Sequence, residues 1–189
     1  MNFVNNIFKS FSWLSNNSTE KYVYVTSKDR TPYQEVTGYF IPTLLNYGFR
    51  DKAKSFADYL ASVQCSNGSW NPPFVFDAAQ IIDGLSEFGN RYSTNINLSV
   101  PWILSQFCNK RFKDPYKGVI SDHIYMRVIY CLSKLGLDIK PVLEEMRSVY
   151  FNDDIFRFTA LSHFYGYAFE GAARLGLDCK RFISEISSY

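Results

Sequence analysis

The feature that most constrains the fold is a long apolar segment that recurs and ends in glycine. Four such segments begin near Gly38, Asp77, Asp122 and His163, and successive starts are 39, 45 and 41 residues apart. Their sequences are TGYFIPTLLNYG, FDAAQIIDGLSEFG, DHIYMRVIYCLSKLG and SHFYGYAFEGAARLG. The spacing is typical of helix-pair repeats. Each segment is apolar around much of its surface, as a buried helix is, and a more polar, one-faced segment follows it. The pattern predicts an all-α fold of repeated αα-hairpins.

The remaining elements follow from helical periodicity and from Gly, Pro and Asn breaks. The predicted helices cover 3–14, 33–49, 50–64, 76–89, 98–108, 122–136, 141–150, 158–176 and 179–188. Polar connections are expected at 15–30, 90–97 and 109–120, and Pro101 is expected in the first turn of its helix. The 189 residues fit a single domain that spans the whole chain, 1–189.

The stretch from Phe56 to Trp70 predicts a helix end closed by a turn. Gln64 offers an amide to the unpaired carbonyls there, and Asn67-Gly68 can adopt positive φ and bring Trp70 back over the helix. The spacing YLxxxQxxxGxW at 59–70 resembles the QW motif of terpene cyclases and the related repeats of prenyltransferase β-subunits. Both are α/α toroids, and in them the motif is structural. Trp70 is therefore expected to be a packing staple, with ligand contact as the second interpretation.

A second resemblance covers more of the chain. The strings YQEVTGYFIPTLL at 33–45, ADYLASVQ, NGSW and VFDAAQIIDGL occur in this order. They resemble prenyltransferase-like toroid proteins of bacterial polysaccharide and surface-glycan gene clusters. This resemblance implies a partial, shortened α/α toroid, because the chain has room for fewer helix pairs than such toroids commonly have. The DxDD motif of protonating terpene cyclases is absent, and the zinc ligands of protein prenyltransferases have no counterpart.

In α/α toroids the ligand cavity lies at one end of the inner ring, so polar residues at matching positions of the inner helices are the candidates. The predicted catalytic residues are Glu35, Arg127, His163 and Tyr167, and the predicted substrate-binding residues are Tyr39, Trp70, Asp77, Gln80, His123 and Glu170. If the inner helices run parallel, these residues gather at one mouth. Such a set suits a carbohydrate, because a carboxylate or imidazole can move protons and tyrosine rings can stack on a sugar face.

Each candidate also has a purely structural interpretation. Glu35 lies at a helix start, where its negative charge would interact favourably with the helix macrodipole. Asp77 could be the N-cap of its helix, and Gln80 could form a hydrogen bond with loop backbone. His163 could equally be a core histidine whose ring nitrogens are hydrogen-bonded within the protein. Arg127 lies in an apolar helix, where burial without a partner would be costly, so a carboxylate partner is expected from Glu35, Asp77 or Glu170. Gly84, Gly166 and Gly171 are expected to allow close helix approach.

Composition excludes several function classes. Net charge is +2 without a basic run, so no nucleic-acid partner is expected. The four cysteines are widely spaced and only two histidines are present, which predicts reduced thiols and neither metal nor cofactor. The N-terminus lacks the pattern of a signal peptide, and no segment gives roughly 18 consecutive apolar residues, so a cytoplasmic protein without a membrane span is expected.

Three functions remain open from the sequence. The first is a carbohydrate-processing or carbohydrate-binding protein of bacterial surface-polysaccharide biosynthesis, with acid/base chemistry on a sugar if it is catalytic. The second is a non-catalytic scaffold, a toroid fragment that buries its open edge against a partner or a second copy as a homodimer. The third is an isoprenoid-binding protein related to the cyclases and prenyltransferases. A polar cavity at the inner helices would favour the first, and an apolar cavity the third.

Overall fold

The structure is a computed structural model that describes residues 3–113, 124–150 and 162–180. Its helices are α1 (Phe3–Asn16), α2 (Gln34–Asn46), α3 (Arg50–Ser62), α4 (Val75–Ser86), α5 (Ser93–Ser105), α6 (Tyr125–Lys134), α7 (Lys140–Tyr150) and α8 (Ser162–Arg174). A 3-10 helix, η1 (Gly89–Tyr92), precedes α5, and strands β1 (Phe107–Cys108) and β2 (Arg111–Phe112) pair antiparallel. The described chain is mostly helical, as predicted. In it, no helix is long and apolar enough to cross a membrane.

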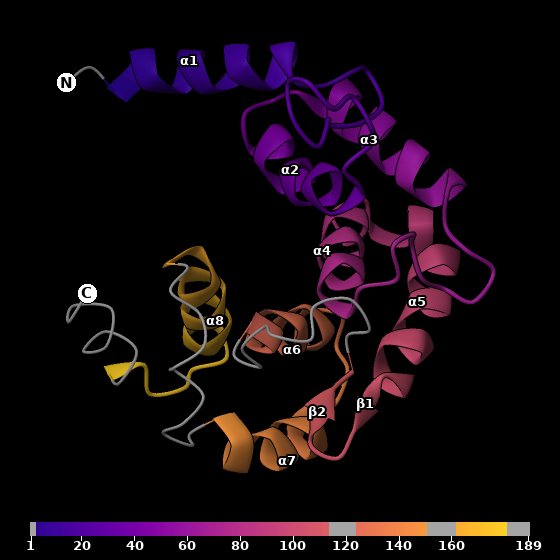
Figure 1. Cartoon of the computed structure of the whole chain (residues 1–189), viewed down its shortest axis with the longest axis vertical. Coiled ribbons are helices and arrows are strands. Elements are labelled where there is room, and N and C mark those ends of the chain that lie inside the picture. Colours follow the sequence, from indigo (N-terminus) through magenta and orange to yellow (C-terminus); the bar gives the residue numbers. More distant parts are fainter. Residues whose placement is uncertain (1–2, 114–123, 151–161, 181–189) are drawn as a thin grey trace.

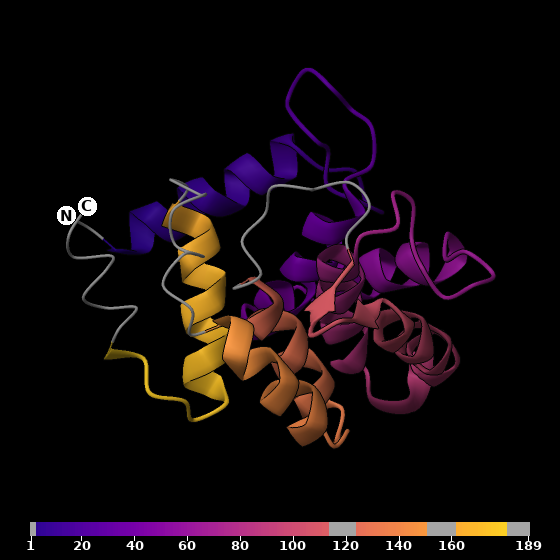
Figure 2. The same ribbon diagram turned by 60° about the horizontal axis from the view of Figure 1, so that its bottom comes forward.

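The helices form a curved row with an inner and an outer side (Figure 1). Helices α2, α4, α6 and α8 contact one another in succession along the inner side. Helix α3 packs on α2 and α5 packs on α4, while α7 lies on the outer side of α6. Figure 2, turned from the first view, also places α8 beside α6. The chain therefore alternates between inner and outer helices.

Helix α4 lies at the centre of the row and is buried on all sides. Every residue from Val75 to Leu85 is buried, in agreement with its apolar sequence. The fully buried core side chains come from both helix sets: Ile41, Leu44, Phe56, Leu60, Ile81, Ile82, Leu85, Ile103, Val128, Ile129 and Leu132. A helix that is apolar all round requires such an environment, so the sequence predicted the burial of α4 correctly.

Two pairs of inner helices approach closely at glycines. A Cβ added to Gly84 would lie 2.4 Å from the carbonyl oxygen of Gly38 in α2. Pro42 follows Gly38 by four residues and has no N–H, so this carbonyl lacks its usual helical donor and faces α4 instead. A Cβ added to Gly171 of α8 would lie 2.4 Å from the carbonyl carbon of Met126 in α6. The close approach predicted at Gly84 and Gly171 is confirmed.

The predicted staple at the end of α3 is confirmed. The indole N–H of Trp70 donates to the carbonyl oxygen of Leu60 at 2.8 Å, and the tryptophan is only 2% exposed. The amide of Gln64, which was expected to bond the carbonyls at the helix end, instead donates to the carbonyl oxygens of Gly68 at 3.1 Å and Asn95 at 3.0 Å. Gly68 has φ +92°, and an added Cβ there would lie 2.1 Å from the carbonyl oxygen of Leu98 in α5. Only glycine fits this turn.

The predicted loop at 90–97 is wrong, because η1 and the first turns of α5 occupy it. Tertiary hydrogen bonds explain the difference. The Asn95 side chain donates to the carbonyl oxygen of Ala61 at 3.2 Å and to Gln64 Oε1 at 2.8 Å. These partners, Ala61 in α3 and Gln64 just after it, satisfy a polar residue that otherwise favours a turn. As a consequence Pro101 lies inside α5 on its exposed side, and not in the first turn.

Two more local predictions are wrong. Asp77 is not an N-cap, because Phe74 occupies that position without a side-chain cap bond and Asp77 lies in the first turn of α4. The predicted connection at 109–120 contains strand β2, since the chain turns at Asn109 and Lys110 with φ of 52° and 65°. Residues 114–120 lie outside the described residues.

Candidate functional site

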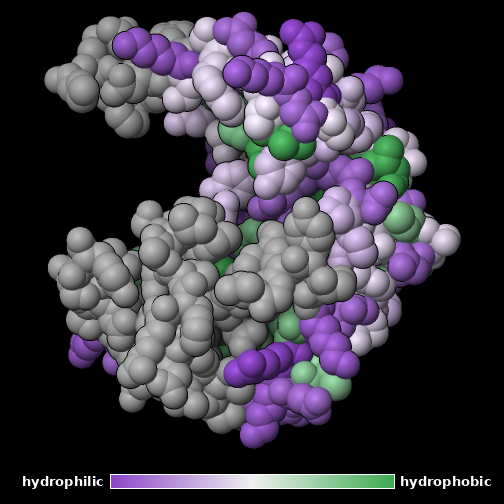
Figure 3. Space-filling model, in the orientation of Figure 1, coloured by the Kyte–Doolittle hydropathy of each residue, from purple (hydrophilic) through white to green (hydrophobic). Residues whose placement is uncertain are grey.

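The four inner helices together line a groove of about 420 Å3. Its walls are α2 and α8, with α4 and α6 between them, and Figure 3 shows the molecule hollowed on the inner side of the helix row. The lining residues are Tyr39, Pro42, Thr43, Asn46, Asp83, Glu87, Arg127, Tyr130, Lys134, Glu170 and Arg174. The groove is therefore mainly polar and charged.

Each inner helix carries a set of residues at the same spacing, and all of them except Pro42 are polar or charged. Positions i, i+3 and i+7 are Tyr39, Pro42 and Asn46 in α2; Gln80, Asp83 and the C-cap residue Glu87 in α4; Arg127, Tyr130 and Lys134 in α6; and Tyr167, Glu170 and Arg174 in α8. This spacing places each set on one helix face. Arg127 near the start of α6 bonds Gln80, while Lys134 at its end bonds Glu87. Helices α4 and α6 therefore run in the same direction, and their polar faces align.

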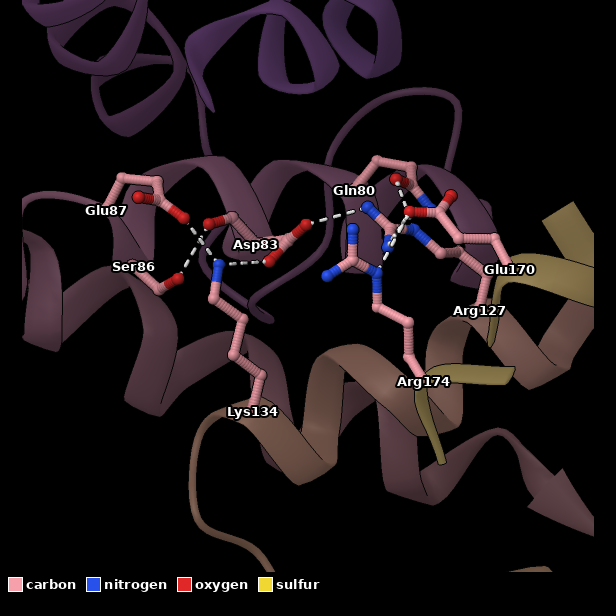
Figure 4. A network of polar contacts seen from close by, with 8 residues as sticks. All are labelled: Gln80, Asp83, Ser86, Glu87, Arg127, Lys134, Glu170 and Arg174. Carbon is pink, nitrogen blue, oxygen red and sulfur yellow. Dashed lines mark hydrogen bonds and ion pairs between the residues drawn. The ribbon is translucent and has the colours of Figure 1, made fainter. Parts of the chain in front are cut away.

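Arg127 joins three inner helices (Figure 4). Its Nη2 lies 2.8 Å from Asp83 Oδ2, its Nη1 lies 3.3 Å from Glu170 Oε1, and its Nε donates to Gln80 Oε1 at 3.3 Å. The residue is only 7% exposed. The expectation of a carboxylate partner is confirmed, and Glu170 is one of those predicted. Asp83 supplies the shorter contact and was not predicted.

Lys134 extends this network along α6. Its Nζ lies 2.7 Å from Asp83 Oδ1 and 2.5 Å from Glu87 Oε1. Burial acts to lower the pKa of Lys134, but the hydrogen bonds with Asp83 and Glu87 outweigh it and raise that pKa above its usual value. Each carboxylate oxygen of Asp83 therefore accepts a hydrogen bond from a different cation, Oδ2 from Arg127 and Oδ1 from Lys134. The negative charge of Asp83 is thus paired within the protein.

Arg174 and Tyr130 form the outer part of the network. Arg174 Nε lies 3.4 Å from Glu170 Oε1, and its guanidinium carbon lies 5.5 Å from the centre of the Tyr130 ring. The guanidinium carbon of Arg127 lies 5.1 Å from the same ring. Two cations therefore contact one aromatic ring, an arrangement that stabilises both.

A second polar cluster lies near the starts of α2 and α4. Glu35 and Asp77 are 9% and 8% exposed. Tyr33 forms a side-chain hydrogen bond with Glu35, and its pKa is raised by burial and by the charges of Glu35 and Asp77. These carboxyl groups therefore share one buried environment, in which Tyr33 remains a neutral hydrogen-bond donor at neutral pH.

Tyr167 of α8 belongs to the same cluster. Burial, followed by the charge of Glu35, raises the pKa of Tyr167 to about 12. Its ring centre lies 4.9 Å from that of Phe76 and 6.2 Å from that of Tyr39. At neutral pH its phenol is therefore protonated and acts as a hydrogen-bond donor.

The structure divides most of the predicted residues between the buried cluster and the groove. Glu35, Asp77 and Tyr167 lie in the buried cluster. Tyr39, Arg127 and Glu170 line the groove, and Gln80 lies beneath it in contact with Arg127. Trp70 lies in the staple between α3 and α5 and does not line the groove. His123 lies outside the described residues; His163 belongs to α8, but its side chain is not among those described.

Several groove residues were missed by the sequence prediction: Asp83, Glu87, Tyr130, Lys134 and Arg174. A signal for them was present. Gln80, Asp83 and Glu87 are polar residues at i, i+3 and i+7 in an otherwise apolar helix, which indicates a polar stripe on a buried element. The same spacing from Arg127 to Lys134 predicts the facing stripe. The prediction had concentrated on helix starts, whereas the groove runs along the helix faces.

No protein-family model matches the chain, and neither a curated protein nor a solved structure does. Within the described ranges, no group of three or more His, Cys, Asp or Glu residues is placed to hold a metal ion. The functional interpretation therefore depends on the groove lined by charged and aromatic residues and on the buried cluster of Glu35, Asp77, Tyr33 and Tyr167.

Proposed function

We propose that the chain is a partial α/α toroid whose groove binds a carbohydrate. The alternation of inner and outer helices supports the toroid, and so does the parallel course of α4 and α6. One observation supports carbohydrate binding in particular: the same groove combines many hydrogen-bonding groups with the aromatic rings of Tyr39 and Tyr130. Sugars present hydroxyls at their edges and apolar C–H groups on their faces, so a site for them needs both kinds of side chain.

If the protein is catalytic, the buried cluster is the proposed source of acid/base chemistry. Glu35 is held by Tyr33 and is nearly buried, and Tyr167 offers a proton. A carboxylate and a protonated phenol at one site are the two partners that proton transfer to and from a sugar requires. His163 remains a candidate on α8. A role in bacterial surface-polysaccharide biosynthesis and a cytoplasmic location remain part of this proposal.

Binding to defined oligosaccharides tests the proposal. A panel of neutral, amino-sugar and uronic-acid oligosaccharides, titrated by calorimetry, is expected to give saturable binding for at least one class. Glu35→Gln is expected to abolish turnover of the bound sugar without lowering Tm. Asp51→Asn is the matched control, because Asp51 is an acidic residue in the first turn of the outer helix α3. Absence of binding across the whole panel would exclude the proposal. If Glu35→Gln lowers Tm but leaves turnover unchanged, the role of Glu35 is structural and not catalytic.

A scaffold function is the second candidate, and one observation favours it. Three large apolar side chains are exposed near the start of the helix row: Trp13 at 56%, Tyr47 at 50% and Phe49 at 46%. Phe11 of α1 packs its ring against those of Tyr47 and Phe49, at 5.0 and 4.7 Å between centres. Light scattering that shows a homodimer would support this function, and a monodisperse monomer would contradict it. The charged groove gives the isoprenoid-binding alternative no support.

A further inference from the structure

The carboxylates of the groove are already engaged by cations of the protein. Asp83 contacts both Arg127 and Lys134, Glu87 contacts Lys134, and Glu170 Oε1 lies 3.3 Å from Arg127 and 3.4 Å from Arg174. Because these pairs hold the negative groups inside the network, a ligand meets mainly the groups that remain unused.

The unused groups are hydrogen-bond donors. Among the described residues, Arg174 uses only its Nε for a carboxylate, so the two terminal nitrogens of its guanidinium have no hydrogen-bond partner. Its side chain is 56% exposed. Lys134 uses two of its three N–H donors, for Asp83 and Glu87, and is 33% exposed. Both cations line the groove, so its open side presents donors.

A buried donor beside Arg127 is also unpaired within the described residues, although Gln80 itself does not line the groove. Gln80 is 1% exposed, and its Oε1 accepts from Arg127 Nε, which fixes the orientation of the amide. Its Nε2 has no hydrogen-bond partner within the described part of the chain. A buried donor of this kind is usually satisfied by a water or a ligand oxygen.

The guanidinium of Arg174 has two neighbours at the groove. Its Nε lies 3.4 Å from Glu170 Oε1, and its carbon lies 5.5 Å from the centre of the Tyr130 ring. The two terminal nitrogens of a guanidinium form a planar fork that matches the two oxygens of a carboxylate.

We propose that the groove recognises a carboxylate-bearing sugar, a uronic acid, through Arg174, with Lys134 adding a second positive charge at the groove. This inference rests on the proposed carbohydrate binding and specifies its substrate class. The carboxylate forms two parallel hydrogen bonds with the terminal nitrogens of Arg174, and the sugar ring lies in the groove between Tyr130 and the exposed Tyr39.

The test compares each uronic-acid oligosaccharide with its carboxyl-reduced counterpart, which differs only by a primary alcohol in place of the carboxylate. Oligomers of glucuronate, galacturonate and mannuronate are titrated into the full chain by calorimetry. The acidic form is expected to bind at least roughly tenfold more tightly, because charge-assisted hydrogen bonds are about twice as strong as neutral ones. Raising NaCl to about 0.5 M is expected to weaken the acidic form selectively.

Two variants connect the effect to Arg174. Arg174→Gln is expected to remove the preference for the acidic form, and Arg174→Lys to restore it only in part, since a lysine cannot form the planar fork. Arg91→Gln is the matched control. Arg91 is 52% exposed, lies 3.7 Å from Asp58 Oδ1 and 5.7 Å from the Tyr92 ring, and does not line the groove. Its replacement is expected to leave binding unchanged.

The outcomes separate this inference from the proposed function. Equal binding of the acidic and reduced oligosaccharides overturns the carboxylate inference and leaves carbohydrate binding standing. Equal binding of a sulfated oligosaccharide of the same length, or an equal loss in Arg91→Gln, indicates general attraction of anions and also overturns it. No binding of any oligosaccharide, acidic or reduced, overturns the proposed function itself.

Discussion

Arg127 Nη2 lies 2.8 Å from Asp83 Oδ2, and both side chains are less than one-tenth exposed. The pair lies between α4 and α6, in the middle of the inner helix row. Removing two charges from water is costly, so such a pair contributes little net stability compared with apolar residues. Its effect is to fix how the helices align, because loss of either partner leaves the other charge buried.

Asp83→Ala is therefore expected to lower the free energy of unfolding by about 3–5 kcal/mol. Urea denaturation followed by circular dichroism measures this. Asp51→Ala is the matched control, since Asp51 is an exposed aspartate in the first turn of the outer helix α3. Its loss is expected to cost only about 0–1 kcal/mol. If both variants lose the same free energy of unfolding, burial of the Asp83–Arg127 pair does not increase the cost of removing the aspartate.

The contribution of the Lys134 ion pairs to the free energy of unfolding is expected to disappear at high pH. The folded-state pKa of Lys134 is raised above the ordinary value of 10.5, so the folded protein holds this proton more tightly than the unfolded chain does. Its contribution is then fully present below pH 10.5 and is lost as pH rises through the folded-state pKa. The stability difference between the wild type and Lys134→Gln should stay constant from about pH 7 to 9 and shrink as the pH rises past 10.5. A difference that grows in alkali would contradict this prediction.

Gly84→Ala is expected to push α2 and α4 apart. The added Cβ would lie 2.4 Å from the carbonyl oxygen of Gly38, a backbone atom that cannot move without shifting the helix. Overpacking of this kind costs about 1–3 kcal/mol, measurable as a lower Tm. Gly166→Ala is the control in α8. Close approach was predicted there too, but no described atom lies within 4 Å, so alanine should stabilise this helix by about 0.5–1 kcal/mol. A neutral Gly84→Ala would show that the helices can separate freely.

Trp70→Phe is expected to weaken the staple and leave the groove unchanged. The variant loses the hydrogen bond from the indole N–H to Leu60, which with the smaller ring should cost about 1–2 kcal/mol. Thermal unfolding measures the loss. Oligosaccharide affinity should remain as in the wild type, because Trp70 does not line the groove. Lower affinity at full stability would instead support the ligand role first considered for Trp70.

Periodicity was enough to place most helices, because it reports the local match of apolar spacing to a helix turn. It failed at 90–97, where Asn95 gains partners in and just after α3 that lie 34 and 31 residues away in sequence. A polar residue that bonds its own backbone in a turn can equally bond a distant carbonyl in a helix. Local sequence cannot distinguish these two outcomes.

The sequence by itself determined the all-α character of the chain, the packing of Trp70 over the end of α3 and the need of a buried Arg127 for a carboxylate partner. Only the tertiary structure showed that Asp83 is a carboxylate partner of Arg127. It also showed that Arg174 and Lys134 line the groove with N–H donors that no described residue uses. The physical reason is that spacing fixes which residues share a helix face, while the direction in which that face points depends on close packing against neighbouring helices. Here that packing is set by backbone contacts at Gly84 and Gly171.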